Sequence, residues 1–92
     1  PEMTTSLRIF TITNELGIHA RSAALMVDVA SRFRSEILIE KDGREVNAKS
    51  ILGILTLGAP KGSKITVRAE GPDAQEAVDS LGHLIENKFG ES

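Results

Sequence analysis

The sequence of 92 residues contains no cysteine, tryptophan or tyrosine. Without cysteine the chain can have no disulfide framework, no thiolate nucleophile and no metal site built on sulfur, and this composition agrees with a reducing compartment. Because three phenylalanines are its only aromatic residues, the chain also offers few rings on which nucleic-acid bases can stack.

The chain also lacks a strong excess of charge of either sign and has no long hydrophobic run. Eleven basic residues against thirteen acidic ones leave a net charge of −2, which is too close to neutral to favour binding to phosphate backbones. No apolar run approaches the roughly 18 residues of a membrane span, and the opening PEMTTSLRIF lacks the basic start and apolar stretch of a secretory signal. We therefore expect a cytoplasmic protein that neither binds nucleic acid nor inserts into a membrane.

A single domain accounts for the chain. Ninety-two residues suffice for one compact core, and no linker, repeat or low-complexity block interrupts the segment from Ser6 to Phe89. We expect one domain over residues 1–92, with its core between about residues 6 and 89.

Hydrophobic periodicity predicts a strand, a helix and a hairpin in the first half of the chain. Residues 7–13 are rich in β-branched and apolar side chains, which favour a strand. Alanine and valine then recur at helical spacing over residues 20 to about 33. Residues 36–40 alternate like a strand, and Asp42 and Gly43 accept the positive dihedral angles of a tight turn, so two antiparallel strands are predicted.

The second half predicts a short helix, a strand and a longer helix. Ser50 is well placed to cap a helix over residues 51–57. Residues 64–70 alternate between apolar and polar, as in a half-buried strand. Asp73 gives a capping-box-like start to a helix whose apolar positions extend over residues 74–89.

The predicted element order is therefore β-α-β-β-α-β-α. Strands with one polar face imply a sheet that is covered on one side only. We predict an α+β fold of the open-faced α/β sandwich type, in which helices cover one face of a four-stranded, mostly antiparallel sheet.

His19 is the first candidate for chemistry, because it lies at the N-cap or first turn of the helix predicted from residue 20. Several backbone N–H groups have no intrahelical partner there, and the helix end favours an anion. The helix end disfavours the imidazolium by roughly 0.3–1 kcal/mol, and the Arg21 cation acts in the same direction. If the neutral ring attacked a phosphoryl group, the N–H groups and Arg21 would stabilise the phosphate. The alternative is a polar residue that only caps the helix.

Ser50 is the second candidate. Helix capping explains its position fully, but a phosphate on Ser50 would also gain from the helix end and add a charge of about −1.5 to −2 beside apolar side chains. Residues 51–57 carry five large aliphatic residues, more than one helix face can bury. We predict that some are exposed, and if a partner docks on this helix, Ile51, Leu52 and Leu55 are the candidates to bind it.

No other motif suggests a site. His83, the second of two histidines, has no further ligand at metal-binding spacing. The segment GAPKGS lacks the residue order of a nucleotide-binding loop, and no Ser-His-Asp set or close carboxylate pair can be recognised. We therefore expect neither a metal nor a cofactor.

Three segments, GIHARSAALMV, NAKSILGILTLGAPKGSKITV and AEGPDAQEAVDSL, together resemble the HPr family, the histidine-containing phosphocarriers of the bacterial phosphoenolpyruvate:sugar phosphotransferase system. The resemblance covers about residues 6–89 and includes the element order. It implies a phosphoryl carrier rather than an enzyme. Enzyme I, charged by phosphoenolpyruvate, would phosphorylate His19 on Nδ1, and His19 would pass the group to the IIA unit of a sugar permease.

The resemblance also implies roles for other residues. Arg21 matches the family's active-site arginine, and Ser50 matches the serine that an HPr kinase/phosphorylase phosphorylates with ATP in many Gram-positive bacteria and some others. Ile51 and Leu52 match positions that dock partners. Two alternatives remain open: a phosphocarrier of a nitrogen-related branch, and an HPr-like regulatory module that acts through Ser50. We expect a monomer.

Ser22 departs from the family pattern, because a proline usually stands at this position. A proline in the first helical turn fixes φ and removes an N–H group that lacks a partner. Ser22 gives up that rigidity and adds a hydroxyl, which we expect close to the phosphate, where it can bind the anion or alter how fast the phosphate leaves. His19 is expected to remain competent.

Overall fold

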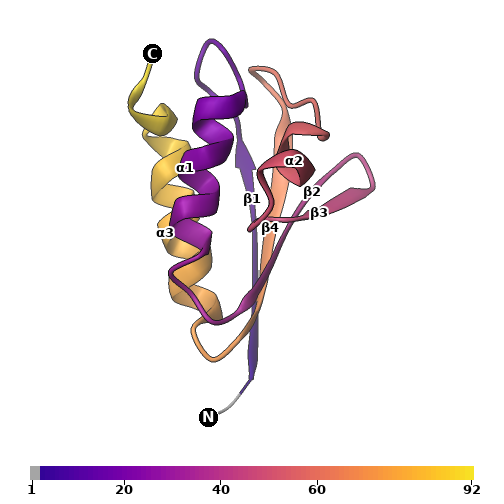
Figure 1. The fold of residues 1–92 in the computed structure, drawn as a ribbon, viewed down its shortest axis with the longest axis vertical. Helices are drawn as coiled ribbons and strands as arrows, with labels where there is room; N and C mark the ends of the chain where they lie inside the picture. The colour runs from indigo at the N-terminus through magenta and orange to yellow at the C-terminus, as the bar shows by residue number, and fades with distance from the viewer. Residues whose placement is uncertain (1–2) are drawn as a thin grey trace.

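The computed structural model describes residues 3–92, in which helices cover one face of a four-stranded sheet (Figure 1). The strands are β1 (Thr4–Thr11), β2 (Glu36–Lys41), β3 (Arg44–Asn47) and β4 (Lys64–Gly71). The helices are α1 (Ala20–Ala30), α2 (Ile51–Leu55) and α3 (Ala74–Glu86), followed by a 3-10 turn, η1 (Lys88–Gly90). The predicted element order is confirmed.

The sheet has the strand order β1-β4-β2-β3, and every neighbouring pair is antiparallel. The β2–β3 hairpin turns at Asp42 and Gly43, whose φ angles are 52° and 86°, as the sequence predicts. These pairings confirm the α+β, open-faced sandwich with a four-stranded antiparallel sheet.

The core lies between the sheet and helices α1 and α3. Alternate residues of β2 and β4 point into it, among them Ile37, Ile39 and Val67, which are fully buried. Helix α3 packs closely on β1, because a Cβ atom at Gly82 would lie 2.6 Å from Cζ of Phe10. The periodic apolar positions of β2, β4 and α3 therefore face one core, whereas on α1 Ala23 and Ala30 are buried but Ala20 and Ala24 are exposed.

Several predicted element ends are wrong. Strand β1 covers residues 4–11 rather than 7–13, α1 ends at Ala30 rather than near residue 33, and α2 ends at Leu55. Helix α3 ends at Glu86, and Phe89, which was expected on it, lies in η1. Lys88 and Phe89 both have a φ of 56°. They reverse the chain and put the Phe89 ring into the core, where its burial offsets the cost of a left-handed backbone.

Asp73 is the N-cap residue of α3, but its side chain does not cap that helix. Its carboxylate instead accepts hydrogen bonds from the backbone N–H groups of Arg34 and Ser35, both at 2.9 Å, and from the Ser35 hydroxyl at 2.5 Å. The Ser35 hydroxyl and then the Arg34 N–H lower the pKa of Asp73 to about 2. The predicted capping box is therefore wrong, and Asp73 instead links the α1–β2 connection to the start of α3.

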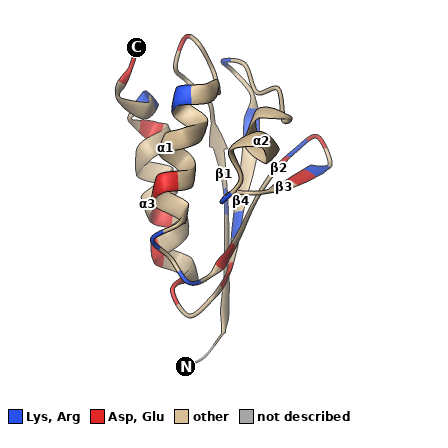
Figure 2. Ribbon diagram, viewed as in Figure 1, with Lys and Arg blue, Asp and Glu red and all other residues tan. Residues whose placement is uncertain are grey.

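Residues 3–92 include no helix that is both long and apolar enough to cross a membrane. Charged residues of both signs are spread over helices, strands and turns (Figure 2). This distribution fits the nearly balanced composition.

Candidate functional site

His19 is the N-cap residue of α1 and has an extended backbone, with φ −136° and ψ −174°. The preceding loop is held against the segment before β4, because the N–H of Ile18 donates to the carbonyl of Ala59 at 2.8 Å. Gly17 permits this approach: its φ is 66°, and a Cβ there would lie 2.6 Å from Ala59 O and 2.7 Å from Pro60 Cα. Local backbone geometry therefore sets His19 at the helix start.

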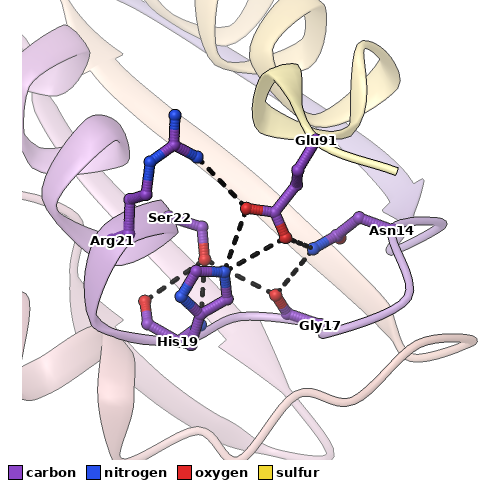
Figure 3. A network of polar contacts seen from close by, with 6 residues as sticks. All are labelled: Asn14, Gly17, His19, Arg21, Ser22 and Glu91. Atoms are coloured by element: carbon purple, nitrogen blue, oxygen red, sulfur yellow. Dashed lines mark hydrogen bonds and ion pairs between the residues drawn. The ribbon is translucent and has the colours of Figure 1, made fainter.

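The His19 ring faces a carboxylate from the other end of the chain (Figure 3). Both carboxylate oxygens of Glu91 lie 3.1 Å from His19 Nε2. The same carboxylate accepts a hydrogen bond from Arg21 Nη1 at 3.2 Å and one from Asn14 Nδ2 at 2.8 Å. The side chains of His19 and Arg21 are 31% and 62% exposed, so the group is open to a partner.

The contact with Glu91 determines which ring nitrogen of His19 carries a proton. The hydrogen bonds from Asn14 and His19, in that order of importance, lower the pKa of Glu91, which is therefore ionised at neutral pH. Because a carboxylate only accepts hydrogen bonds, His19 Nε2 is the donor. Whenever the ring carries a single proton, its lone pair therefore lies on Nδ1. Glu91 thus adds an anion beside a ring at which the sequence indicates only the helix end and Arg21.

Asn14 fastens the Glu91 carboxylate to the loop before α1. Its side chain is fully buried, and its Nδ2 donates to both the Gly17 carbonyl and Glu91 at 2.8 Å. Two acceptors on one side fix the orientation of the amide, and Oδ1 has no hydrogen-bond partner within the described chain. The Glu15 N–H adds a bond to the Ser92 carbonyl at 2.7 Å. The C-terminal tail is thus bound to this loop at two places.

Ser22 lies under His19. Its hydroxyl oxygen accepts the backbone N–H of His19 at 2.9 Å, and the hydroxyl lies 3.2 Å from the His19 carbonyl and 3.5 Å from that of Gly17. The side chain is fully buried. The hydroxyl, which was expected close to the phosphate, makes its hydrogen bonds to the backbone of His19 and Gly17.

Two members of this site, Asn14 and Glu91, were missed by sequence reasoning. Glu91 is 72 residues from His19 along the chain, and it reaches the ring only because the chain reverses at Lys88 and Phe89. No periodic pattern marks such a contact. For Asn14 the sequence gives only a weak indication of a role in the site, namely a polar residue in the loop that leads to Gly17.

The second predicted site is at the start of α2. Ser50 is the N-cap residue, and its Oγ accepts the N–H of Gly53 at 3.0 Å, so the predicted cap is confirmed. Ile51 and Leu52 are 40% and 77% exposed. Leu55 is half-buried and packs against the core. The expected excess of aliphatic surface is therefore present, mainly on Leu52.

The site is a surface, and nothing in it resembles a metal centre. Among residues 3–92 no group of three or more His, Cys, Asp or Glu side chains could hold a metal ion, and these residues enclose no pocket.

Comparison with known proteins identifies the family. Residues 7–87 match the family model described as the PTS HPr component phosphorylation site. The chain is 48% identical over 81 residues to the phosphocarrier protein HPr of Cupriavidus necator, covering 88% of this chain and 91% of the relative. It is 54% identical over 72 residues to the HPr-like protein Crh of Halalkalibacterium halodurans, covering 78% and 86%.

Solved structures agree with the sequence relatives. The crystal structure of HPr-C-His from Thermoanaerobacter tengcongensis is similar to this chain with a TM-score of 0.91 and 49% identity, covering 95% of this chain and 98% of that one. An HPr from Bacillus anthracis matches with a TM-score of 0.84 and 44% identity, covering 88% and 96%. The chain belongs to the HPr family, and it is a phosphocarrier of the bacterial phosphotransferase system rather than an enzyme.

Proposed function

We propose that His19 accepts a phosphoryl group on Nδ1 from enzyme I, which obtains it from phosphoenolpyruvate, and passes it to a IIA unit. The observation that carries the proposal is the contact of His19 Nε2 with Glu91 at 3.1 Å. It leaves Nδ1 as the nitrogen with the lone pair, in a side chain that is partly exposed at a helix start. A phosphocarrier needs a nucleophile of this kind.

The transfer is a displacement at phosphorus. The Nδ1 lone pair forms the new N–P bond while the bond between phosphorus and the donor group of enzyme I breaks, and the donor group keeps that electron pair. The Nε2 proton stays on His19, so the ring becomes positively charged and Glu91 balances that charge. Onward transfer to the IIA unit is the same displacement with His19 as the leaving group.

Arg21 and the first turn of α1 would stabilise the phosphate. The Arg21 guanidinium is 62% exposed and pairs with Glu91 at 3.2 Å, so it can turn to a phosphate on the neighbouring ring. Backbone N–H groups of the first helical turn have no intrahelical acceptor and favour an anion. This surface would hold the phosphoryl group between the two transfers.

Incubation with phosphoenolpyruvate and enzyme I tests the proposal. We expect one acid-labile phosphate on the native chain and none on His19→Ala. His83→Ala is the matched control, because it removes the other histidine, an exposed residue of α3, and it should be phosphorylated like the native chain. Phosphate that persists on His19→Ala, or a native chain that takes up none, contradicts the proposal.

Phosphorylation of Ser50 is a second proposed function. Its support is the exposed start of α2, where a phosphate would meet the Gly53 N–H and lie beside the exposed Leu52. The added charge would oppose docking of an apolar partner surface on Ile51, Leu52 and the accessible part of Leu55. ATP and an HPr kinase/phosphorylase should give an acid-stable phosphate on the native chain and on His19→Ala but none on Ser50→Ala.

The acceptor of the phosphate decides between the two relay branches. Phosphorylated protein can be mixed with the IIA unit of a sugar permease or with the corresponding unit of a nitrogen-related branch, and the rate of transfer compared. We expect faster transfer to the sugar-branch unit. Leu52→Asp should slow transfer to either unit, because Leu52 is the most exposed aliphatic residue of α2.

A further inference from the structure

Ser22 is a buried polar residue whose side-chain hydrogen bonds all go to the backbone of His19 and Gly17. Its side chain is fully buried, so its hydroxyl needs partners within the protein. The partners are the His19 N–H at 2.9 Å and the carbonyls of His19 and Gly17 at 3.2 and 3.5 Å. Nothing in the phosphotransfer step itself uses this hydroxyl.

These bonds fix the backbone of His19 on both sides of its Cα atom. The N–H of His19 is held by Ser22 Oγ, and the His19 carbonyl accepts the N–H of Ala23 at 2.8 Å. With both peptide groups bound to the first turn of α1, the direction of the Cα–Cβ bond is set. The ring therefore approaches Glu91 from a backbone that two hydrogen bonds hold in place.

A proline at this position would act differently. Proline fixes its own φ angle but offers no acceptor for the His19 N–H, whereas the hydroxyl of Ser22 restrains residue 19 directly. With proline, the φ angle of residue 22 would be fixed. With serine, it is the backbone of His19, the reactive residue, that is held.

We propose that Ser22 is a positioning residue for His19: its hydroxyl holds the His19 backbone so that Nε2 meets Glu91 and Nδ1 is presented to the phosphoryl donor. This inference rests on the proposed function. It predicts that loss of the hydroxyl slows the transfer step without weakening the docking of enzyme I, because a fully buried side chain cannot contact a docked partner.

The test compares Ser22→Ala and Ser22→Thr with the native chain and with Ser35→Ala. Ser35 is the matched control, since it is also a buried serine with a hydrogen-bonded hydroxyl, but it lies beyond the other end of α1. Backbone amide exchange reports on the His19 N–H. Phosphorylation by enzyme I over a range of protein concentrations separates the saturated rate from KM, at a temperature where all variants are folded.

We expect Ser22→Ala to lose protection of the His19 amide and to show a saturated rate lower by about two- to tenfold, the range that one net hydrogen bond provides, with an unchanged KM. Ser22→Thr retains an oxygen acceptor and should recover the rate, and Ser35→Ala should change neither value. An unchanged rate in Ser22→Ala, or a change in KM alone, overturns the inference and leaves the phosphocarrier proposal intact. If the native chain is not phosphorylated, both fall.

Discussion

Gly17 offers a quantitative test of how the loop before α1 positions His19. Its φ of 66° costs a residue with a Cβ atom about 1–2 kcal/mol. In Gly17→Ala the new atom would also lie 2.6 Å from Ala59 O and 2.7 Å from Pro60 Cα. Both are backbone atoms that cannot rotate away, so overpacking adds about 1–3 kcal/mol. The free energy of unfolding should fall by about 2–5 kcal/mol in total.

Gly58→Ala is the matched control for this prediction. Gly58 has a φ of 58°, but a Cβ atom there would meet nothing within 4 Å. Gly58→Ala therefore loses stability only through the positive φ angle. Both variants make the unfolded chain less flexible, and the stability gained in this way is the same for both. In a domain of this size each kcal/mol lowers the melting temperature by about 4–8 °C.

Thermal unfolding followed by circular dichroism compares the two variants. We expect Gly17→Ala to melt at least about 5 °C below Gly58→Ala. Phosphorylation of Gly17→Ala by enzyme I should also be slower, because the clash disturbs the Ile18–Ala59 bond that holds the loop. Equal melting temperatures would refute the claim that the close approach of this loop requires glycine.

Three further outcomes are expected. Asp73 has a lowered pKa of about 2, against about 3.8 unperturbed, so its stabilisation is present above about pH 4 and is lost as the pH falls toward 2. Urea unfolding should show that Asp73→Asn is less stable than the native chain at pH 7 and loses less stability between pH 4 and pH 2; parallel losses would contradict this. Ser50→Ala should lower the free energy of unfolding by about 1 kcal/mol through loss of the α2 cap, and an unchanged urea midpoint would contradict it. Glu91→Gln should reduce the saturated rate of phosphorylation on the order of tenfold, the effect of one charge-assisted hydrogen bond; a rate equal to that of the native chain would show that the carboxylate plays no part.

Local patterns in the sequence were sufficient to predict the element order and the sheet. The alternation around Ile37 and Ile39 and the turn at Asp42 and Gly43 each depend on residues that are close in the chain. The Ser50 cap is local in the same sense. These features were predicted correctly because the physics that decides them acts over a few residues.

The parts that were missed depend on distant contacts. Helical spacing extends to Phe89, but burial of that ring in the core stops the helix at Glu86 and turns the tail back toward α1. The Glu91 carboxylate reaches His19 only as a result of that turn. Asp73 was assigned to its own helix, whereas its carboxylate binds a loop 38 residues away.

The chemical identity of the phosphorylated nitrogen tests the phosphocarrier proposal most directly. The chain can be labelled with ¹⁵N-histidine, phosphorylated with phosphoenolpyruvate and enzyme I, and studied by NMR for coupling between phosphorus and nitrogen. We predict coupling to Nδ1 of His19, since Glu91 holds the proton on Nε2. Coupling to Nε2 of His19, or to either nitrogen of His83, would contradict it.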